Sequence, residues 1–381
     1  MTLIKNGKIL TMAGEVIENG EILIQGNKIV KVGKNINIPQ NCNVIDAEGG
    51  YVTPGFIDAH CHIGLFEQDM GFEGEDGNEI TDPTTPQLRA IDAINPMDSA
   101  FKEAYENGVT CVCTGPGSAN VLGGTFAIIK TKGIRIDNMI VKENAAMKCA
   151  FGENPKRCYD AKKQSPSTRM ATASILRESL MKAKDYLDKK ENSKNKPAFD
   201  MKMEALIPVL KKEIPLKAHA HRADDIFTAI RIAKEFDVNL TLDHCTEGHL
   251  IADELAKENF NAIVGPTFGF RTKIEVKNKT FETLKVLKDA GVKFAIMTDH
   301  PVIPLQNLPL CAALGVKAGL DEETALKAIT INAAEILGIQ DRVGSIEEGK
   351  DADIAIFDKH PFDLQASTKY VFIDGEMVYG K

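Results

Sequence analysis

Both ends of the chain alternate apolar and polar residues in short runs separated by turn dipeptides. In the first fifty residues the turns are Asn6-Gly7, Asn19-Gly20 and Gly26-Asn27, and such dipeptides between alternating runs indicate β-hairpins. The last forty residues follow the same pattern around Asp374-Gly375. Neither end holds enough strand to bury both faces of a sheet, so we expect the two ends to pair in one small β-sandwich.

Between the ends, short apolar runs alternate with longer segments of helical period. The apolar runs predict eight strands, at residues 55–60, 109–113, 126–130, 145–150, 216–220, 239–243, 262–264 and 294–297. A hairpin-like run over residues 125–141 makes the third and fourth strands the least distinct. Helices are predicted from Asn95-Pro96 to just before Gly108, and over residues 167–189, 223–236, 250–257, 280–290 and 322–337.

Repeated strand–helix units indicate a parallel sheet, and eight of them favour a closed (β/α)8 barrel of the TIM type. The fold class predicted is therefore α/β with three parts. Residues 1–54 form the N-terminal part of the β-sandwich, residues 55–340 form the barrel, and residues 341–381 form the C-terminal part of the sandwich.

Composition narrows the classes of function. A net charge of −8 argues against nucleic acid as a partner, because a phosphate-binding face needs clustered Lys and Arg. No apolar run approaches the roughly 18 residues of a transmembrane helix, and the first residues show no signal-peptide pattern. The eight cysteines form no C-x-x-C pair, so we expect reduced thiols in a cytoplasmic protein that has no membrane partner.

Most of the eight histidines stand at the C-terminal ends of predicted strands. They are His60 and His62 after the first strand, His219 and His221 after the fifth, His244 after the sixth, and His300 after the eighth, where Asp299 precedes it. Residues two apart in a strand point to one face, so each H-x-H pair aims two imidazoles into one volume. In a barrel these strand ends converge.

A single histidine in an apolar strand is usually a core or surface residue with a satisfied hydrogen bond. A cluster at one end of a barrel is different, here five of these histidines (His60, His62, His219, His221 and His244) with Asp299, because imidazoles buried together without a metal cost desolvation and repel one another once protonated. We therefore predict a metal site. His249 and His360 are expected outside the ligand set, with His249 a candidate substrate contact.

The chain resembles the metal-dependent amidohydrolase superfamily, and above all its imidazolonepropionase-like and prolidase-like branch. The motifs that carry the resemblance are P-G-F-I-D-A-H-C-H, H-A-H-R-A-D-D-I, L-D-H-C-T-E-G-H, M-T-D-H-P and G-S-I-E-E-G-K-D-A-D-I, which span nearly the whole chain. The resemblance implies a (β/α)8 barrel beside a terminal β-sandwich. It also implies hydrolysis of an amide or cyclic-amide C–N bond in a small molecule, in a superfamily where homo-oligomers are common.

The resemblance also implies metal ligands, namely His60, His62, His219, His244 and Asp299. Two-metal members bridge their ions with a glutamate or a carboxylated lysine near the end of the third or fourth strand. Glu153 is the favoured candidate, because it stands at the strand end, and Lys148 is the alternative. Zn²⁺ is the expected ion, as one ion or two, and Mn²⁺ or Fe²⁺ suits similar ligands.

The chemistry expected is attack by metal-activated water on an amide carbonyl. Asp299 would accept the proton of the water and pass it to the leaving nitrogen. His221 or His300 would help the metal to stabilise the oxyanion.

Three loops carry further candidates for substrate contacts. Arg222 and Arg271 could bind a substrate carboxylate. Residues 67–82 hold seven acids and no Lys or Arg, so this loop would favour a cationic substrate if it lay over the site, or it is simply a solvated loop. Residues 115–124 are glycine-rich without the lysine of a phosphate loop, and we expect them to line the site as a tight turn.

Two rival functions remain open. A deaminase of the same superfamily usually carries a glutamate a few residues after the fifth-strand histidine, whereas this chain has A-H-R-A-D-D-I there, so that Asp224 or Asp225 would have to substitute. A barrel that binds without catalysis is the other alternative. It is disfavoured because the first-strand pair, the later histidines and Asp299 are all present.

Overall fold

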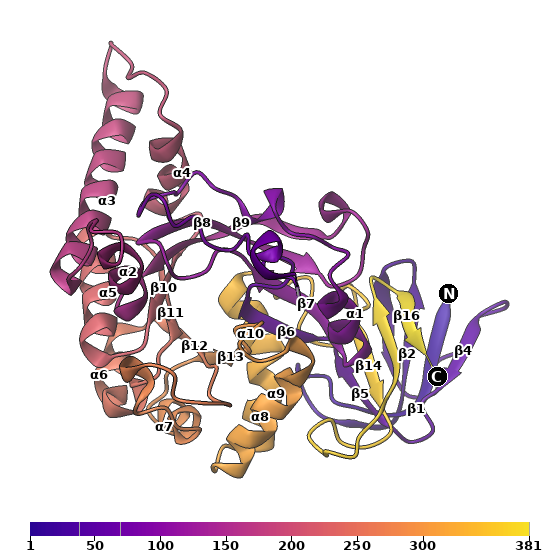
Figure 1. Ribbon diagram of the computed structural model, residues 1–381. Coiled ribbons are helices and arrows are strands. Elements are labelled where there is room, and N and C mark those ends of the chain that lie inside the picture. Colours follow the sequence, from indigo (N-terminus) through magenta and orange to yellow (C-terminus); the bar gives the residue numbers. More distant parts are fainter. Residues whose placement is uncertain (38, 69, 381) are drawn as a thin grey trace.

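The two ends of the chain pair in one eight-stranded sheet, so the expected pairing of the termini is confirmed. Gly26-Asn27 and Asp374-Gly375 join antiparallel strands, as predicted. The turns predicted at Asn6-Gly7 and Asn19-Gly20 are wrong, because both dipeptides lie inside strands, where Gly7 pairs with Gly20 at a shift in register. The computed structural model describes residues 1–37, 39–68 and 70–380. The strand order is β16-β15-β14-β5-β1-β2-β3, and β4 pairs with β1. N- and C-terminal strands meet where β14 pairs antiparallel with β5, beside the barrel in Figure 1. The strands are β1 (Thr2–Ile9), β2 (Ile17–Gln25), β3 (Lys28–Gly33), β4 (Asn43–Asp46), β5 (Tyr51–Pro54), β14 (Ile354–Phe357), β15 (Thr368–Ile373) and β16 (Glu376–Gly380).

The central segment forms a nearly closed eight-stranded barrel, and all eight predicted strands are confirmed to within a few residues at most of their ends. The barrel closes between its first and last strands, where His62 N donates to His300 O at 2.8 Å and Asp299 N to His60 O at 3.3 Å. The strands, in order around the sheet, are β6 (Phe56–Cys61), β7 (Val109–Thr114), β8 (Leu122–Lys130), β9 (Ile140–Ala150), β10 (Leu216–Ala220), β11 (Leu240–His244), β12 (Asn261–Val264) and β13 (Phe294–Ile296).

The prediction of an entirely parallel barrel is wrong at β8, which runs antiparallel to both β7 and β9. The reason is the connection from Lys130 to Ile140, which holds only a short 3-10 turn at Ile136–Asn138. A parallel crossover needs a dozen or more residues, whereas antiparallel neighbours need only a short loop. As a result, the glycine-rich segment before β8 enters the barrel at the end where the histidines lie.

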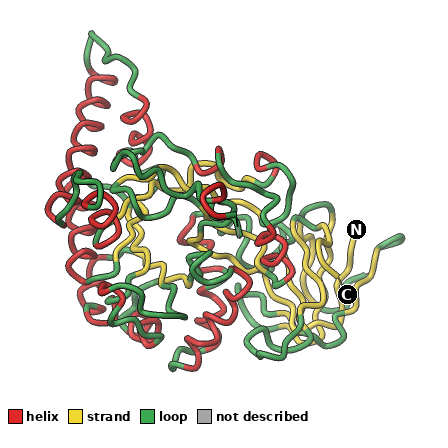
Figure 2. The backbone as a smooth tube through the Cα atoms, in the orientation of Figure 1, coloured by secondary structure: helices red, strands yellow, loops and turns green. Residues whose placement is uncertain are grey.

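Ten α-helices are present among the described residues, and α3 and α4 pack together in an arm that extends from the barrel (Figures 1 and 2). Two helix predictions need correction. The helix expected from Asn95-Pro96 begins at Ser99, where the Asp98 carboxylate accepts from Ala100 N, and the helix expected over 322–337 breaks at Thr330. The helices are α1 (Ser99–Glu106), α2 (Glu153–Asp160), α3 (Arg169–Asn192), α4 (Met201–Leu210), α5 (Ala223–Phe236), α6 (Ala252–Glu258), α7 (Glu282–Asp289), α8 (Leu308–Lys317), α9 (Glu322–Ala328) and α10 (Ile331–Leu337).

None of these helices, within the described ranges, is both long and apolar enough to cross a bilayer.

A buried lysine joins the barrel to the terminal sheet. Lys130, at the end of β8, is 3% exposed. Its Nζ lies 2.8 Å from Asp353 Oδ1, 3.3 Å from Asp351 Oδ2 and 3.1 Å from Asp374 Oδ1. Burial alone would lower the pKa of Lys130, but these carboxylates outweigh burial and raise the pKa above its ordinary value. The ammonium therefore stays charged and balances the buried acids.

We expect Lys130→Met to lower the free energy of unfolding by about 3–5 kcal/mol, because it leaves the buried carboxylate of Asp353 without its counter-charge, whereas Asp351 keeps Lys28 and Arg342. Urea denaturation would measure the change. Lys102→Met is the control, since Lys102 forms an exposed pair with Glu106 at 3.8 Å, and such pairs contribute less than about 1 kcal/mol. Equal, small losses in both variants would contradict a structural role for Lys130.

Candidate metal centre

Two histidines and an aspartate meet where β6 lies beside β13. His60 belongs to β6, His62 follows it directly, and Asp299 follows β13. Asp299 Oδ1 lies 3.4 Å from His60 Nε2 and 3.2 Å from His62 Nε2. One ligand atom from each residue lies within 4.8 Å of the others, so the three could bind one ion.

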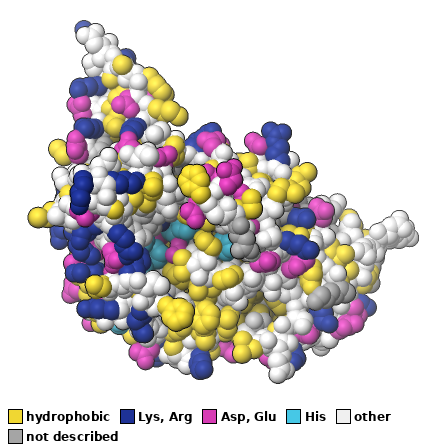
Figure 3. Space-filling view, in the orientation of Figure 1, with side chains coloured by type: hydrophobic (Ala, Val, Ile, Leu, Met, Phe, Trp, Pro, Cys, Tyr) yellow, Lys and Arg dark blue, Asp and Glu magenta, His cyan; other side chains and the backbone are white. Residues whose placement is uncertain are grey.

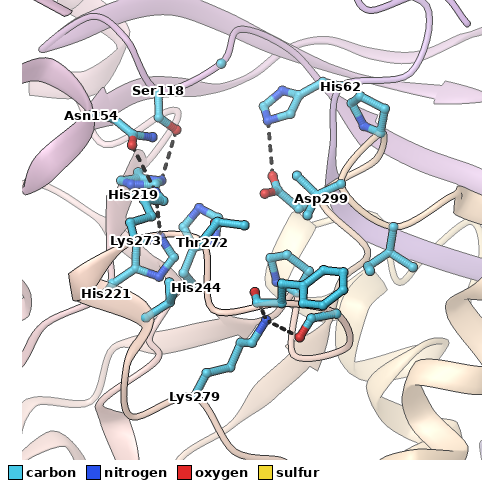
Figure 4. Close-up of a pocket in the computed structure, with 18 of the residues that line it drawn as sticks. His62, Ser118, Asn154, His219, His221, His244, Thr272, Lys273, Lys279 and Asp299 are labelled. Carbon is cyan, nitrogen blue, oxygen red and sulfur yellow. Dashed lines mark hydrogen bonds and ion pairs between the residues drawn. The ribbon is translucent and has the colours of Figure 1, made fainter. Parts of the chain in front are cut away.

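Three more histidines form a second group. His219 belongs to β10, His221 follows that strand, and His244 ends β11. Their ligand atoms also lie within 4.8 Å of one another. The ring of His244 stands 4.3 Å from that of His219 and 5.6 Å from that of His60, so the two groups adjoin (Figure 4).

Hydrogen bonds at Nδ1 orient these imidazoles. His62 Nδ1 lies 2.6 Å from Gly115 O, and His244 Nδ1 lies 2.8 Å from Gly265 O. A carbonyl only accepts, so Nδ1 carries the proton in both rings and the Nε2 lone pair is free. His219 Nδ1 bonds to Ser118 Oγ at 2.9 Å, and His221 Nδ1 to Thr246 Oγ1 at 2.7 Å. Hydroxyl partners allow the same arrangement.

Burial keeps the imidazoles neutral. It lowers the pKa of His60 to about 4 and that of His221 to about 3. Burial, reinforced by neighbouring imidazoles, holds the pKa values of His219 and His244 well below the ordinary range. Burial raises the pKa of Asp299, but His244, His60 and His62 outweigh it and keep this carboxylate ionised. Neutral imidazole and ionised carboxylate are the forms that bind a metal.

A buried aspartate and lysine support His60 from the side away from Asp299. Asp243 Oδ2 lies 2.8 Å from His60 Nδ1, and Lys217 Nζ lies 3.3 Å from Asp243 Oδ1. Burial opposes the charge of Asp243, but Lys217 and His60 overcome it and depress the pKa of that carboxyl. A carboxylate behind a histidine fixes its tautomer and directs Nε2 outward, a common arrangement at metal sites.

Asp58, which the strand pattern places on the face of His60, serves the backbone instead. Its carboxylate accepts from His60 N at 3.0 Å and from Thr298 N and Oγ1 at 2.9 and 2.6 Å. It thus ties β6 to the residue before Asp299. His300 is buried nearby, and its Nδ1 accepts from Leu305 N at 3.2 Å.

Lys148, rather than Glu153, stands among the candidate ligands. Lys148 is fully buried in β9, with Nζ 3.4 Å from His60 Nε2. Burial lowers the pKa of its ammonium to about 8. Glu153 opens α2 and forms an ion pair with Arg157 one turn later. Lys148 therefore contacts a residue of the first ligand group, whereas Glu153 pairs with a cation outside both groups.

The glycine-rich segment lines the site, as expected. Gly115 and Ser118 hold His62 and His219 through the hydrogen bonds given above. A Cβ on Gly117 would stand 2.5 Å from Asn78 Oδ1, so a larger residue here would displace the Asn78 side chain.

A divalent transition metal fits this donor set. The Nε2 atoms of His219 and His244 are buried without a hydrogen-bond partner among the described residues. Buried nitrogens are rarely left without a partner, because desolvation is then uncompensated. Imidazole nitrogens with a carboxylate are ligands that Zn²⁺ and similar ions take.

The two groups of candidate ligands, His60–His62–Asp299 and His219–His221–His244, are called the metal groups below. They open into a cavity of about 560 Å³, a size suited to a small organic molecule. His62, His219, His221, His244 and Asp299 line it. In Figure 3 the histidines lie in a hollow, with basic side chains to one side and hydrophobic side chains below.

The predicted substrate contacts lie off this cavity. Arg222 bonds to Asp224 at the start of α5, Arg271 donates to Lys279 O, and His249 pairs with Thr283. None of these three is among the lining residues, and neither is His300. The described acids of residues 67–82 do not line the cavity either, whereas Asn78 does. The remaining acid of this segment, Asp69, lies outside the described residues.

The sequence model of the amidohydrolase family matches this chain over residues 51–378. The chain belongs to the amidohydrolase family. The resemblance found in the motifs is thereby confirmed. A crystal structure of an amidohydrolase from Thermotoga maritima MSB8 is similar over 100% of both chains, with 46% identity and a TM-score of 0.97.

Other amidohydrolase relatives are more distant. Amidohydrolase tasK of Hapsidospora irregularis is 29% identical over 89% of this chain, but the chain spans only 37% of that protein's length. An imidazolonepropionase of Paracoccus denitrificans (strain Pd 1222) is 26% identical over 96% of this chain and 95% of its own.

Several residues of this amidohydrolase site escaped the sequence reasoning. Lys217 stands two residues before His219, and Asp243 stands one residue before His244. Their nearness to these histidines in the sequence was the signal that could have marked them as candidates. Glu275 and Lys273 come from the loop after β12, and Glu275 Oε1 lies 2.8 Å from Lys273 Nζ and 3.7 Å from His221 Nε2. Their segment has no period, so only the fold brings them to the histidines.

Proposed function

We propose that this chain is a metal-dependent hydrolase that cleaves an amide or cyclic-amide C–N bond of a small molecule. The observation that carries the proposal is the pair of ligand groups at one end of the barrel, His60–His62–Asp299 and His219–His221–His244. Their anchored Nδ1 atoms leave Nε2 lone pairs facing a cavity of substrate size.

The proposed ion is Zn²⁺, one or two, held by His60, His62, His219, His244 and Asp299. When bound, Zn²⁺ lowers the pKa of coordinated water from about 15.7 towards 7 and polarises a carbonyl oxygen. Asp299 accepts a proton from the attacking water and delivers it to the leaving nitrogen. His221 lines the cavity and is the residue proposed to stabilise the oxyanion, which requires the tautomer in which Nδ1 accepts from Thr246 Oγ1 and Nε2 carries the proton. His300, the other candidate, does not line the cavity.

Lys148 is the proposed bridging residue in place of Glu153. Its neutral amine can add to CO₂, which forms an N–C bond, releases one proton and yields a carbamate. A pKa of about 8 leaves part of the amine neutral near physiological pH. The product would put two oxygens beside His60 Nε2, where the amine now stands at 3.4 Å.

We further propose that residues 1–54 and 341–381 act as one support for the barrel of residues 55–340. All eight cysteines are free thiols, which suits the proposed cytoplasmic location.

Hydrolysis assays with the metal-replete protein test this function. We expect release of a primary or secondary amine, or opening of a ring, from at least one member of a panel of N-acyl amino acids, dipeptides and cyclic amides. Release of ammonia from aminopurines without amide cleavage would favour a deaminase. That outcome is disfavoured because Asp224 bonds to Arg222 and Asp225 to Arg169, and neither acid lines the cavity.

A further inference from the structure

The wall of the cavity beyond the metal groups is cationic. Its charged lining residues are Arg157, Lys273 and Lys279, and Asp299 is the one acid among the described residues that line it. Since Asp299 belongs to the metal groups, no carboxylate remains on this wall to receive a substrate ammonium. The wall therefore suits a substrate that brings negative charge.

Lys279 is the cation of this wall without an acidic partner. Arg157 pairs with Glu153, and Lys273 with Glu275 at 2.8 Å. Lys279 has no ion pair among the described residues, and its Nζ donates to Gly269 O at 3.2 Å and Phe270 O at 3.0 Å (Figure 4). An ammonium has three donors, so one N–H stays free. Burial, followed by the charge of Arg271, lowers the pKa of Lys279. Both effects would be relieved by an anion.

An apolar surface adjoins this ammonium. Phe268 and Phe270 flank Gly269 on the loop after β12, and both line the cavity with Val302. Phe270 is 90% exposed and Val302 60% exposed. Large exposed apolar side chains at a cavity mouth indicate a contact with an apolar ligand group.

We propose that the substrate is an N-acyl derivative of an apolar amino acid, an inference that rests on the proposed hydrolase function. The carboxylate and the apolar side chain of an amino acid are attached to the same carbon. The cavity offers a matching pair of contacts, the ammonium of Lys279 for the carboxylate and the adjoining Phe268 and Phe270 for the side chain. The acyl group is neutral, which matches the lack of an acid for a free ammonium. Water adds its oxygen to the acyl carbon, the C–N bond breaks, and both water protons end on the amine, giving a carboxylate and an amino acid.

Three matched amides test the proposal with metal-replete protein: N-acetyl-leucine, glycyl-leucine, which adds an ammonium to the acyl group, and N-isopentylacetamide, which lacks the carboxylate. The first two are used as both enantiomers. We expect N-acetyl-leucine to have the highest kcat/KM, by about 10-fold or more over each of the others. Equal or better use of glycyl-leucine or N-isopentylacetamide would overturn the inference.

Variants assign the carboxylate contact. Lys279→Met should reduce kcat/KM for N-acetyl-leucine about 10- to 100-fold, mainly through KM, and leave N-isopentylacetamide within about 3-fold. Lys279→Arg should restore most of the loss, which shows that the loop still folds. Lys277→Met is the control, because Lys277 is exposed and does not line the cavity. An equal loss for both amides in Lys279→Met, unrelieved by Lys279→Arg, would overturn the contact.

Calorimetric binding separates this inference from the proposed function. If no amide is hydrolysed but N-acetyl-leucine binds and Lys279→Met weakens it at least 10-fold, the anion site stands and the hydrolase proposal fails. If other amides are hydrolysed while N-acetyl-leucine is neither cleaved nor bound, the hydrolase proposal stands and the substrate class is wrong.

Discussion

Asp299→Asn should reduce kcat for amide hydrolysis by about 1,000-fold or more while the protein stays folded. Asp299 lines the cavity, and its Oδ1 lies 3.2 Å from His62 Nε2. An amide of the same shape cannot accept the proton of water, and general-base catalysis contributes about 100- to 10,000-fold. The amide introduced by Asp299→Asn also binds a cation more weakly than the carboxylate of Asp299 does. Steady-state assays on the best amide of the panel, with equal metal loading, measure the effect.

Asp341→Asn is the matched control, because Asp341 is exposed and far along the chain from the ligand groups. It should keep wild-type kcat. Melting curves of both variants should show that neither has unfolded. If Asp299→Asn retained more than a tenth of wild-type kcat, Asp299 would not be the base, and the catalytic proposal would fail even if the metal were present.

Removal of divalent ions with a chelator should abolish turnover and lower the melting temperature. The protein then holds five imidazoles and a carboxylate in one buried space without a cation. A ligand that binds only the folded state stabilises it by about 2.7 kcal/mol at 100 times its Kd. Activity and melting temperature should both return on addition of Zn²⁺, and Mn²⁺ or Fe²⁺ can be compared in the same assay. Full activity in the metal-free protein would refute the metal proposal.

Reloading also tests Lys148. Because a carbamate forms from an amine and CO₂, recovery with Zn²⁺ should be faster and more complete in the presence of bicarbonate. Lys148→Met should bind less metal and lose most activity with or without bicarbonate. Lys142→Met, on the same strand but outside the metal groups, should behave as wild type. If Lys148→Met bound the full metal complement and Glu153→Gln did not, Glu153 and not Lys148 would be the additional metal ligand.

Residues next to one another in the chain were enough to predict much of the centre. Strand alternation puts His60 beside His62, and His219 beside His221, whatever the rest of the fold does. The eight alternating strand–helix units predict a barrel, and in a barrel the strand ends that carry His244 and Asp299 converge with the other two. The structure places these side chains together within the two ligand groups. The shortage of strand at either end likewise predicts that the two ends of the chain pair, as they do in the terminal sheet.

What the tertiary structure decided concerns residues whose neighbours come from distant segments. The direction of β8 depends on a short connection, and it sends Ser118 to His219. The contact of Lys148 with His60 depends on which side of β9 faces inward, and Glu153 pairs with Arg157 one helical turn away. Lys279 rather than Arg271 lines the cavity because an irregular loop, with no period to extrapolate, folds its ammonium onto two carbonyls. Short-range periodicity determines which face a side chain occupies, whereas charge partners and cavity walls arise only when separate loops meet.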